Sequence, residues 1–226
     1  MLQGCQRGNG LNRRCHMDER RENASGGSQR LIIVVDGPNF AGKTTFVGRI
    51  LESLASRGRV SRVLNFPRAN SYWGAQARKA FADPNQCEEV RAELVAQDFA
   101  EELTAVSKTQ ADEVVVWDRF YLSTCSCQGF AGWRKLLHHQ LFDYPVQPDF
   151  YVVLDVDYAE ALRRAKKKRE EEGVAWDQRI EDIELASEEA WDAAREKFAH
   201  YARLVKEKLP NTTFVKIDHN GVLTLL

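Results

Sequence analysis

The residues with the clearest chemical meaning form one glycine-rich segment near residue 40. Residues 37–44 read Gly-Pro-Asn-Phe-Ala-Gly-Lys-Thr, which fits the pattern G-x-x-x-x-G-K-[ST]. The glycines let backbone N–H groups turn inward around an anion, and a helix that begins near Lys43 would add the positive end of its dipole. Lys43 would bridge the β- and γ-phosphates of ATP, and Thr44 would bind Mg²⁺. The expected phosphate-binding residues are Gly37, Pro38, Asn39, Phe40, Ala41, Gly42, Lys43, Thr44 and Thr45. The alternative is a glycine-rich turn with a coincidental lysine.

The chain is long enough for one domain with a substantial core. It has 226 residues, of which 43% are hydrophobic, and its formal net charge is −1. Such a balance does not favour a nucleic acid or an anionic membrane as the main partner. The longest apolar stretches are far shorter than the roughly 20 residues that span a bilayer, so we expect no membrane helix.

Five apolar runs are predicted to be strands, at residues 31–36, 62–66, 113–118, 149–155 and 212–218. Helix-like stretches lie between and around them, at 43–57, 71–82, 86–109, 131–142, 157–172 and 181–208. Nearly continuous apolar strands are typical of a parallel sheet that is covered on both faces. The alternation therefore predicts an α/β fold, a doubly wound parallel five-stranded sheet with helices on both faces. Ligands of such sheets bind beyond the carboxyl ends of the strands.

The first 30 residues differ in composition from the rest of the chain. They are rich in Gly, Asn, Arg and Ser and lack apolar periodicity, so residues 1–30 are predicted to be a disordered extension and residues 31–226 the folded domain. The start has no apolar signal core. The five cysteines are an odd number without a C-x-x-C pair, which argues against a disulfide framework or a zinc site. A cytoplasmic location fits these features.

The third run continues as VVVWDRFYLSTCSCQG, and here the chain resembles the thymidylate kinase family. In that family the matching strand ends in Asp-Arg-Tyr, followed by a Ser and an aromatic-Gln-Gly segment. Phe66-Pro67-Arg68 resembles the family's acceptor-phosphate motif. PDFYVVLDVDYAEALRRAKKKR resembles its fourth strand and arginine-rich lid, and KIDHNG its last strand. The resemblance covers about residues 31–220.

The resemblance implies a P-loop kinase that transfers the γ-phosphate of ATP to a (deoxy)nucleoside monophosphate such as dTMP. Because two polyanions approach each other in that reaction, positive charge must come from several directions. Arg68 and Arg119 are suited to bidentate binding of the acceptor phosphate. Asp118 would orient Mg²⁺ or its waters. The alternatives are a structural ion pair between Asp118 and Arg119, and an ordinary surface arginine at Arg68.

Residues 163–172, RRAKKKREEE, are either a solvated helix face or a lid. The basic residues precede the acidic ones, which is the weaker order for i,i+4 pairs and the wrong one for the helix dipole. This order favours a lid that brings an arginine to the transferring phosphate. Arg164 and Arg169 of this lid join Lys43, Asp118 and Arg119 as the predicted catalytic residues, and Arg163 and Lys167 are other candidates in the lid. Asp177-Gln178-Arg179 resembles the family's Asp-Arg pair with one residue inserted.

The acceptor side departs from the family pattern. An acidic residue of the family's phosphate loop is replaced by Asn39, and its aromatic beside the deoxyribose by Cys127. The helix that contacts the base in the family reads ELVAQDFAEEL here, so the resemblance places Val95 and Phe99 at the base positions and leaves Gln97 for a two-pronged amide contact. The implied acceptor-binding residues are Asn39, Phe66, Arg68, Gln97, Arg119, Ser123 and Gln128.

Two other functions stay open at this point. One is a kinase for a nucleoside, or for a hydroxyl of DNA or a modified base, which would not need Arg68 as a phosphate clamp. A nucleic acid is a partner only under that alternative. The other is a nucleotide-binding switch without turnover, against which the lid and Asp118-Arg119 argue. A homodimer is an open arrangement that the sequence does not decide.

Overall fold

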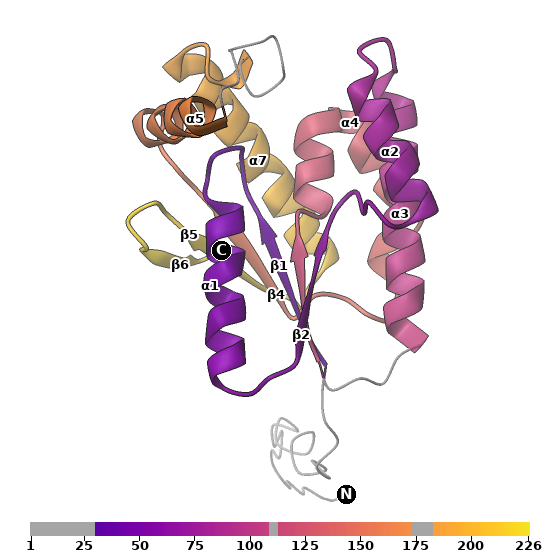
Figure 1. Cartoon of the computed structure of the whole chain (residues 1–226). Coiled ribbons are helices and arrows are strands. Elements are labelled where there is room, and N and C mark those ends of the chain that lie inside the picture. The colour runs from indigo at the N-terminus through magenta and orange to yellow at the C-terminus, as the bar shows by residue number, and fades with distance from the viewer. Residues whose placement is uncertain (1–29, 109–112, 173–182) are drawn as a thin grey trace, which may run out of the picture.

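The computed structural model contains one mixed sheet between two layers of helices (Figure 1). It describes residues 30–108, 113–172 and 183–226. Five strands run parallel: β1 (Leu31–Asp36), β2 (Ser61–Asn65), β3 (Val114–Asp118), β4 (Phe150–Leu154) and β5 (Thr213–Ile217). A sixth strand, β6 (Leu223–Leu225), pairs antiparallel with β5, and the order across the sheet is β2-β3-β1-β4-β5-β6. The doubly wound α/β prediction is confirmed, with one strand more than expected.

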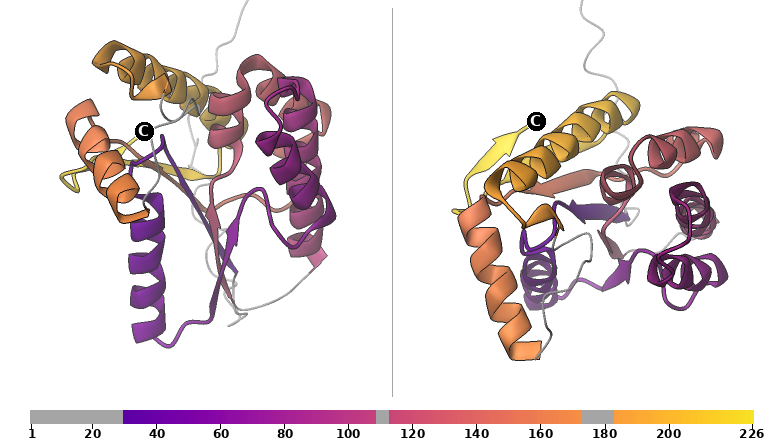
Figure 2. Two further views of the ribbon diagram at one scale, coloured as in Figure 1. Left: turned by 45° about the horizontal axis from the view of Figure 1, so that its top comes forward. Right: turned by 90° about the horizontal axis from the view of Figure 1, so that it is seen from above.

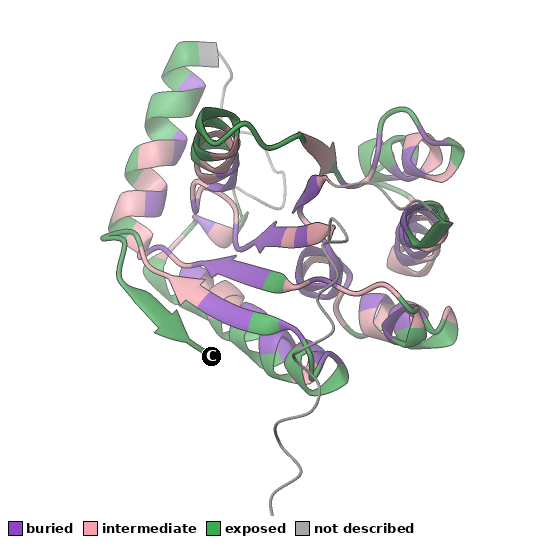
Figure 3. Cartoon of the chain, turned by 90° about the horizontal axis from the view of Figure 1, so that it is seen from below, coloured by how far each residue is buried: buried purple, intermediate pink, exposed green. Residues whose placement is uncertain are grey.

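Successive residues of a strand point alternately into two separate hydrophobic cores, one on each face of the sheet. In β3, Val115 and Trp117 belong to one core, whereas Val114 and Val116 belong to the other. Every residue of β3 is buried, because helices cover both faces. Figure 3 shows the contrast with the edge strand β6, whose Leu223 and Leu225 are exposed.

The helices divide between the two faces, as the views in Figure 2 show. Helices α1 (Lys43–Ser56) and α5 (Tyr158–Glu172) lie on one face. Helices α3 (Glu88–Lys108), α4 (Tyr121–His138) and α7 (Glu188–Lys208) lie on the other, where α3 packs on α4 and α4 on α7. Helix α2 (Tyr72–Ala82) packs on α3, and a single 3₁₀ turn, Leu141–Asp143, follows α4.

The prediction was wrong about the extent of one helix and missed one strand. A helix was expected at 131–142, but α4 begins ten residues earlier, at Tyr121. Its first half is rich in Ser, Thr, Cys and Gly, which are weak helix formers, and Gly129 adopts non-helical angles inside it. The N-terminus of α4 forms because the buried carboxylate of Asp36 accepts the backbone N–H groups of Phe120 and Ser123. The sixth strand was missed because it is three residues long and exposed.

Two further expectations concern regions beyond the core. The predicted disordered extension lies, except for Arg30, outside the described residues. Within the described ranges, no helix is long and apolar enough to cross a membrane.

Candidate active site

The glycine-rich segment connects β1 to α1, as the sequence pattern requires. Gly37 has φ 147°, and a Cβ atom there would lie 2.5 Å from the carbonyl oxygen of Leu154, so only glycine fits. Gly42 has φ 93° and caps the N-terminus of α1. Helix α1 therefore points its N-terminal N–H groups and dipole into the loop, where an anion would bind. Thr44 and Thr45 are exposed in its first turn.

Lys43 is buried inside this loop. Its Nζ atom donates hydrogen bonds to the carbonyl oxygens of Gly37 at 2.8 Å and Pro38 at 2.7 Å. The pKa of Lys43 is lowered from 10.5 to about 7, mainly by burial and also by the nearby charge of Arg119, whereas Asp36 and Asp118 oppose the shift. Phosphate oxygens would replace the two carbonyls with full negative charges and thereby stabilise the ammonium form.

Asp36 supports the loop, although the sequence analysis did not select it. Its buried carboxylate accepts hydrogen bonds from the backbone N–H groups of Gly37, Phe120 and Ser123, from the Ser123 hydroxyl and from the Tyr151 hydroxyl. These bonds tie the ends of β1 and β3 to β4. The available signal was an acidic residue at the end of a fully apolar strand, directly before the first glycine.

Asp118 and Arg119 lie beside the loop at the end of β3. Asp118 is 6% exposed, and its Oδ1 atom has no hydrogen-bond partner within the described residues. Burial raises the pKa of Asp118, against the charges of Lys43 and Arg119. Arg119 adopts φ 69°, and its Nη2 atom donates to Oδ1 of Asn39 at 3.1 Å. Within the described residues these two side chains form no ion pair with each other, so the structural ion pair is not what this strand end shows.

A cavity of about 800 Å³ opens next to these residues. It brings together five of the predicted acceptor-binding residues: Asn39, Phe66, Arg119, Ser123 and Gln128. It is also lined by Val95, Phe99 and Cys127, which the sequence analysis placed at the family's base and sugar positions. Its lining further includes residues that the sequence analysis did not name, among them Asn65, Arg78, Phe81 and Thr124. Arg68 and Gln97 do not line it.

Arg68 is bound to carboxylates of the protein, unlike an arginine that is available to bind a phosphate. It is 9% exposed, and its guanidinium forms ion pairs with Asp98 at 2.8 Å, Glu101 at 2.8 Å and Glu102 at 2.9 Å. Three carboxylates of α3 therefore hold this side chain away from the cavity. The three-residue motif could not show this, because the partners lie some 30 residues away along the chain.

Gln97 also points to a different place. Its Nε2 atom donates to Oε1 of Glu93 at 3.1 Å, one turn earlier on α3. Glu93 in turn pairs with Lys135 and His139, at the end of α4. The predicted two-pronged contact with a base has no support in this arrangement.

The predicted lid begins with α5. The Nη1 atom of Arg164 donates to the Phe40 carbonyl at 3.2 Å, and its Nε atom bonds Glu160 at 2.7 Å, so this arginine lies against the phosphate loop. Arg169 is 8% exposed, farther along the helix. Arg163 points to solvent and pairs with Glu160. Residues Asp177, Gln178 and Arg179 fall outside the described residues.

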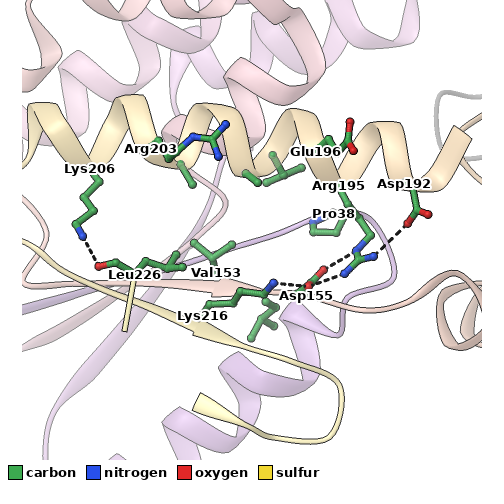
Figure 4. Close-up of a pocket in the computed structure, with 14 residues that line it drawn as sticks. Pro38, Val153, Asp155, Asp192, Arg195, Glu196, Arg203, Lys206, Lys216 and Leu226 are labelled. Carbon is green, nitrogen blue, oxygen red and sulfur yellow. Dashed lines mark hydrogen bonds and ion pairs between the residues drawn. The ribbon is translucent and has the colours of Figure 1, made fainter. Parts of the chain in front are cut away.

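A second cavity, of about 650 Å³, lies between α7 and strands β4 and β5 (Figure 4). Several of its charged groups have partners within the cavity: Asp155 binds Arg195 at 2.8 Å and Lys216 at 2.7 Å, and Lys206 bonds the carbonyl of Leu226. Arg195 and Lys216 come from α7 and β5, so these bonds fasten the helix to the sheet.

Comparisons with known proteins agree with this geometry. A family described as thymidylate kinase matches residues 35–211. A thymidylate kinase of Chlamydia trachomatis serovar L2 is 32% identical over 151 residues, covering 61% of this chain and 73% of the relative. One of Xanthomonas euvesicatoria pv. vesicatoria is 32% identical over 143 residues, covering 61% and 62%. The solved thymidylate kinase of Candida albicans, described as having broad substrate specificity, aligns with a TM-score of 0.59 and 14% identity, covering 84% of this chain and 85% of that one.

Proposed function

This chain belongs to the thymidylate kinase family of ATP-dependent nucleoside monophosphate kinases, and we propose that it phosphorylates an acceptor such as dTMP in the cavity beside its phosphate loop. The observation that carries the proposal is the meeting of three groups at adjoining strand ends. Lys43 lies in the loop after β1, and Asp118 and Arg119 lie at the end of β3, which pairs directly with β1.

The donor phosphates would bind at the N-terminus of α1. The backbone N–H groups of the loop would surround them, and Lys43 would exchange the carbonyls of Gly37 and Pro38 for phosphate oxygens. Arg164, which already bonds the Phe40 carbonyl, would stabilise the charge that spreads over the transferring group. Arg169 stays a second lid candidate.

Arg119 would connect the two substrates. Its guanidinium contacts Asn39 of the phosphate loop and also lines the acceptor cavity. It can therefore neutralise negative charge on the acceptor phosphate while the acceptor oxygen is held in line with the γ-phosphorus. The rate enhancement would come mainly from positioning and charge.

We propose Mg²⁺ as the metal of the reaction. Hydroxyl and carboxylate oxygens are the ligands that Mg²⁺ prefers, and Thr44 and Asp118 supply one of each. The unpartnered Oδ1 atom of Asp118 fits a role in binding the ion or its water shell. Mg²⁺ would neutralise phosphate charge when bound. A cytoplasmic location remains part of the proposal, and a homodimer stays an open arrangement.

An acceptor panel tests this function. Purified protein is incubated with Mg-ATP and dTMP, thymidine or a DNA oligonucleotide, and formation of ADP is followed. We expect turnover with dTMP. The second candidate is a nucleoside kinase. It is favoured by the pairing of Arg68 with three carboxylates, because the cavity then has one cation fewer to bind an acceptor phosphate. Efficient turnover of thymidine with none of dTMP would establish that candidate instead.

A further inference from the structure

The cavity between α7 and strands β4 and β5 contains only one of the residues assigned to the active site, Pro38 of the phosphate loop (Figure 4). We propose that this cavity binds an amphipathic carboxylate, an apolar chain with one anionic head group, and that the bound ligand weakens the binding of ATP. The inference rests on the proposed function only in so far as ATP binds the phosphate loop. It does not depend on which acceptor is phosphorylated.

Apolar side chains form a large part of the cavity lining. Val153 and Leu154 contribute from β4 and Phe198 and Ala202 from α7, and each of the four is less than 10% exposed. Ala199 also lines the cavity, three positions before Ala202 and on the same face of α7. These two small side chains leave space between the helix and the sheet. With about 650 Å³, the cavity has the size of a small-molecule site, and its apolar part favours a hydrocarbon chain.

The charges at one end of the cavity already balance one another. Arg195 pairs with Asp155 and Asp192, and Lys216 pairs with Asp155. Glu196 adds a further acidic group next to Arg195 along α7. Among the described residues this end therefore has no cation without an acidic partner, and an anionic head group is not expected to bind there.

Two cations lie away from these acids. Arg203 and Lys206 are three positions apart on one face of α7, and both line the cavity. Arg203 lies seven positions beyond Glu196, which is roughly 10 Å along the helix axis. Lys206 bonds the carbonyl oxygen of Leu226, whereas Arg203 is exposed and has no ion-pair partner in the described part of the chain. One available guanidinium matches a carboxylate, which can accept two parallel N–H bonds from it.

The cavity is connected to the donor end of the active site through Pro38. The carbonyl oxygen of Pro38 accepts a hydrogen bond from Lys43 at 2.7 Å. The preceding Gly37 packs so closely on β4 that an added Cβ atom would lie 2.5 Å from the carbonyl oxygen of Leu154. The phosphates of ATP would draw Lys43 away from Pro38. A ligand that fits the cavity as it is without ATP stabilises that arrangement, so the two ligands should oppose each other.

Isothermal titration calorimetry with decanoate tests this site in the full chain. Butyrate and decylamine are the comparison ligands, because the first lacks the long chain and the second carries the opposite charge. The variants are Ala199→Trp, which fills the cavity, and Arg203→Met, which removes the available cation. Their controls are Ala193→Trp and Lys208→Met, which change exposed residues of α7 that do not line the cavity. The Kd for ATP is measured with and without saturating decanoate, and thermal melting checks the fold.

We expect decanoate to bind, and the affinity to rise by up to about fourfold for each CH₂ group added between butyrate and decanoate. Decylamine should bind more weakly than decanoate. Ala199→Trp should abolish binding, and Arg203→Met should weaken it about two- to fivefold, the range for an exposed ion pair. The controls should leave the affinity unchanged. Saturating decanoate should raise the Kd for ATP by about fivefold or more, and ATP should weaken decanoate binding by the same factor.

Decanoate binding that survives in a folded Ala199→Trp protein, or that decylamine matches, would overturn the site. If Ala199→Trp does not fold, equal affinities of Arg203→Met and Lys208→Met would overturn it. Decanoate binding that leaves the Kd for ATP unchanged would overturn the coupling. A protein that binds ATP but not decanoate would overturn the inference and leave the kinase function standing, whereas a protein that binds no ATP would overturn the proposed function.

Discussion

The donor end and the acceptor end of the cleft are built differently. At the donor end, Lys43 and Asp36 already have hydrogen-bond partners, most of them in the loop or at the adjoining strand ends. At the acceptor end, Arg78 is exposed and Gln128 has a buried amide nitrogen without a partner in the described residues. The donor site is thus largely formed without ligand, whereas the acceptor site has polar groups that a substrate would complete.

The arginines also differ between the cavity and its surroundings. Arg68 stabilises the wall between α3 and the end of β2, and Arg119 and Arg78 line the cavity itself. Chemically identical side chains are therefore tied up in ion pairs in one place and available to a ligand of the cavity in another. Variants of these residues can separate the two roles.

The largest effect is expected from Arg68→Met. The change leaves Asp98, Glu101 and Glu102 without this partner, and Asp98 and Glu102 are buried. Breaking a buried ion pair from one side costs about 3–5 kcal/mol, so the free energy of unfolding should fall by that order. Urea denaturation measures it, with the exposed Arg78→Met variant as control, expected within about 0.5 kcal/mol of wild type. A stable Arg68→Met protein that binds dTMP poorly would show instead that Arg68 is the phosphate clamp.

Lys43→Ala is expected to act on rate and not on folding. The variant removes an ammonium group from the donor phosphates, and loss of one such group typically lowers kcat by about 10²- to 10³-fold, or about 3–4 kcal/mol. Steady-state kinetics with dTMP measure the loss, and circular dichroism checks the fold. Retention of more than about a tenth of the wild-type kcat would contradict the assignment of the loop.

We expect the free energy of unfolding to depend on pH through Asp155, which follows β4. Burial alone would raise its pKa, but hydrogen bonds from Arg195 and Lys216 lower it from 3.8 to about 2. The stabilisation is therefore complete above about pH 5 and is lost as the pH falls through 2, and it amounts to about 2 kcal/mol. The unfolding free energies of wild type and Asp155→Asn, measured from pH 6 to pH 2, should converge at the acid end. A constant difference would mean that the pair does not depend on the charge of Asp155.

The smallest effect is expected from removing residues 1–30. That segment contains no motif and no apolar periodicity, so kcat and the KM values for ATP and dTMP should stay within about twofold of the full chain. Parallel kinetics of both proteins test this. Collapse of activity in the shortened chain would place the extension within the site.

The sequence predicted the donor end better than the acceptor end, for physical reasons. The phosphate loop is a contiguous segment in which each glycine has a local conformational role, and β1 was predicted with its observed bounds. The hydrogen-bond partners of Arg68 and Gln97 depend on how α3 packs against its neighbours, and no local sequence pattern encodes this packing. The start of α4 was missed because its stability comes from Asp36, 84 residues earlier, and not from helix propensity.

The hydrogen bonds of Asp36 also bear on how the protein folds. They join this residue to Phe120, Ser123 and Tyr151, which are 84, 87 and 115 positions away along the chain. Contacts of such long range close large loops and form slowly. During synthesis the phosphate loop cannot gain its full support before Tyr151 has left the ribosome. We therefore expect partly synthesised chains to contain the complete loop sequence and yet to bind no ATP.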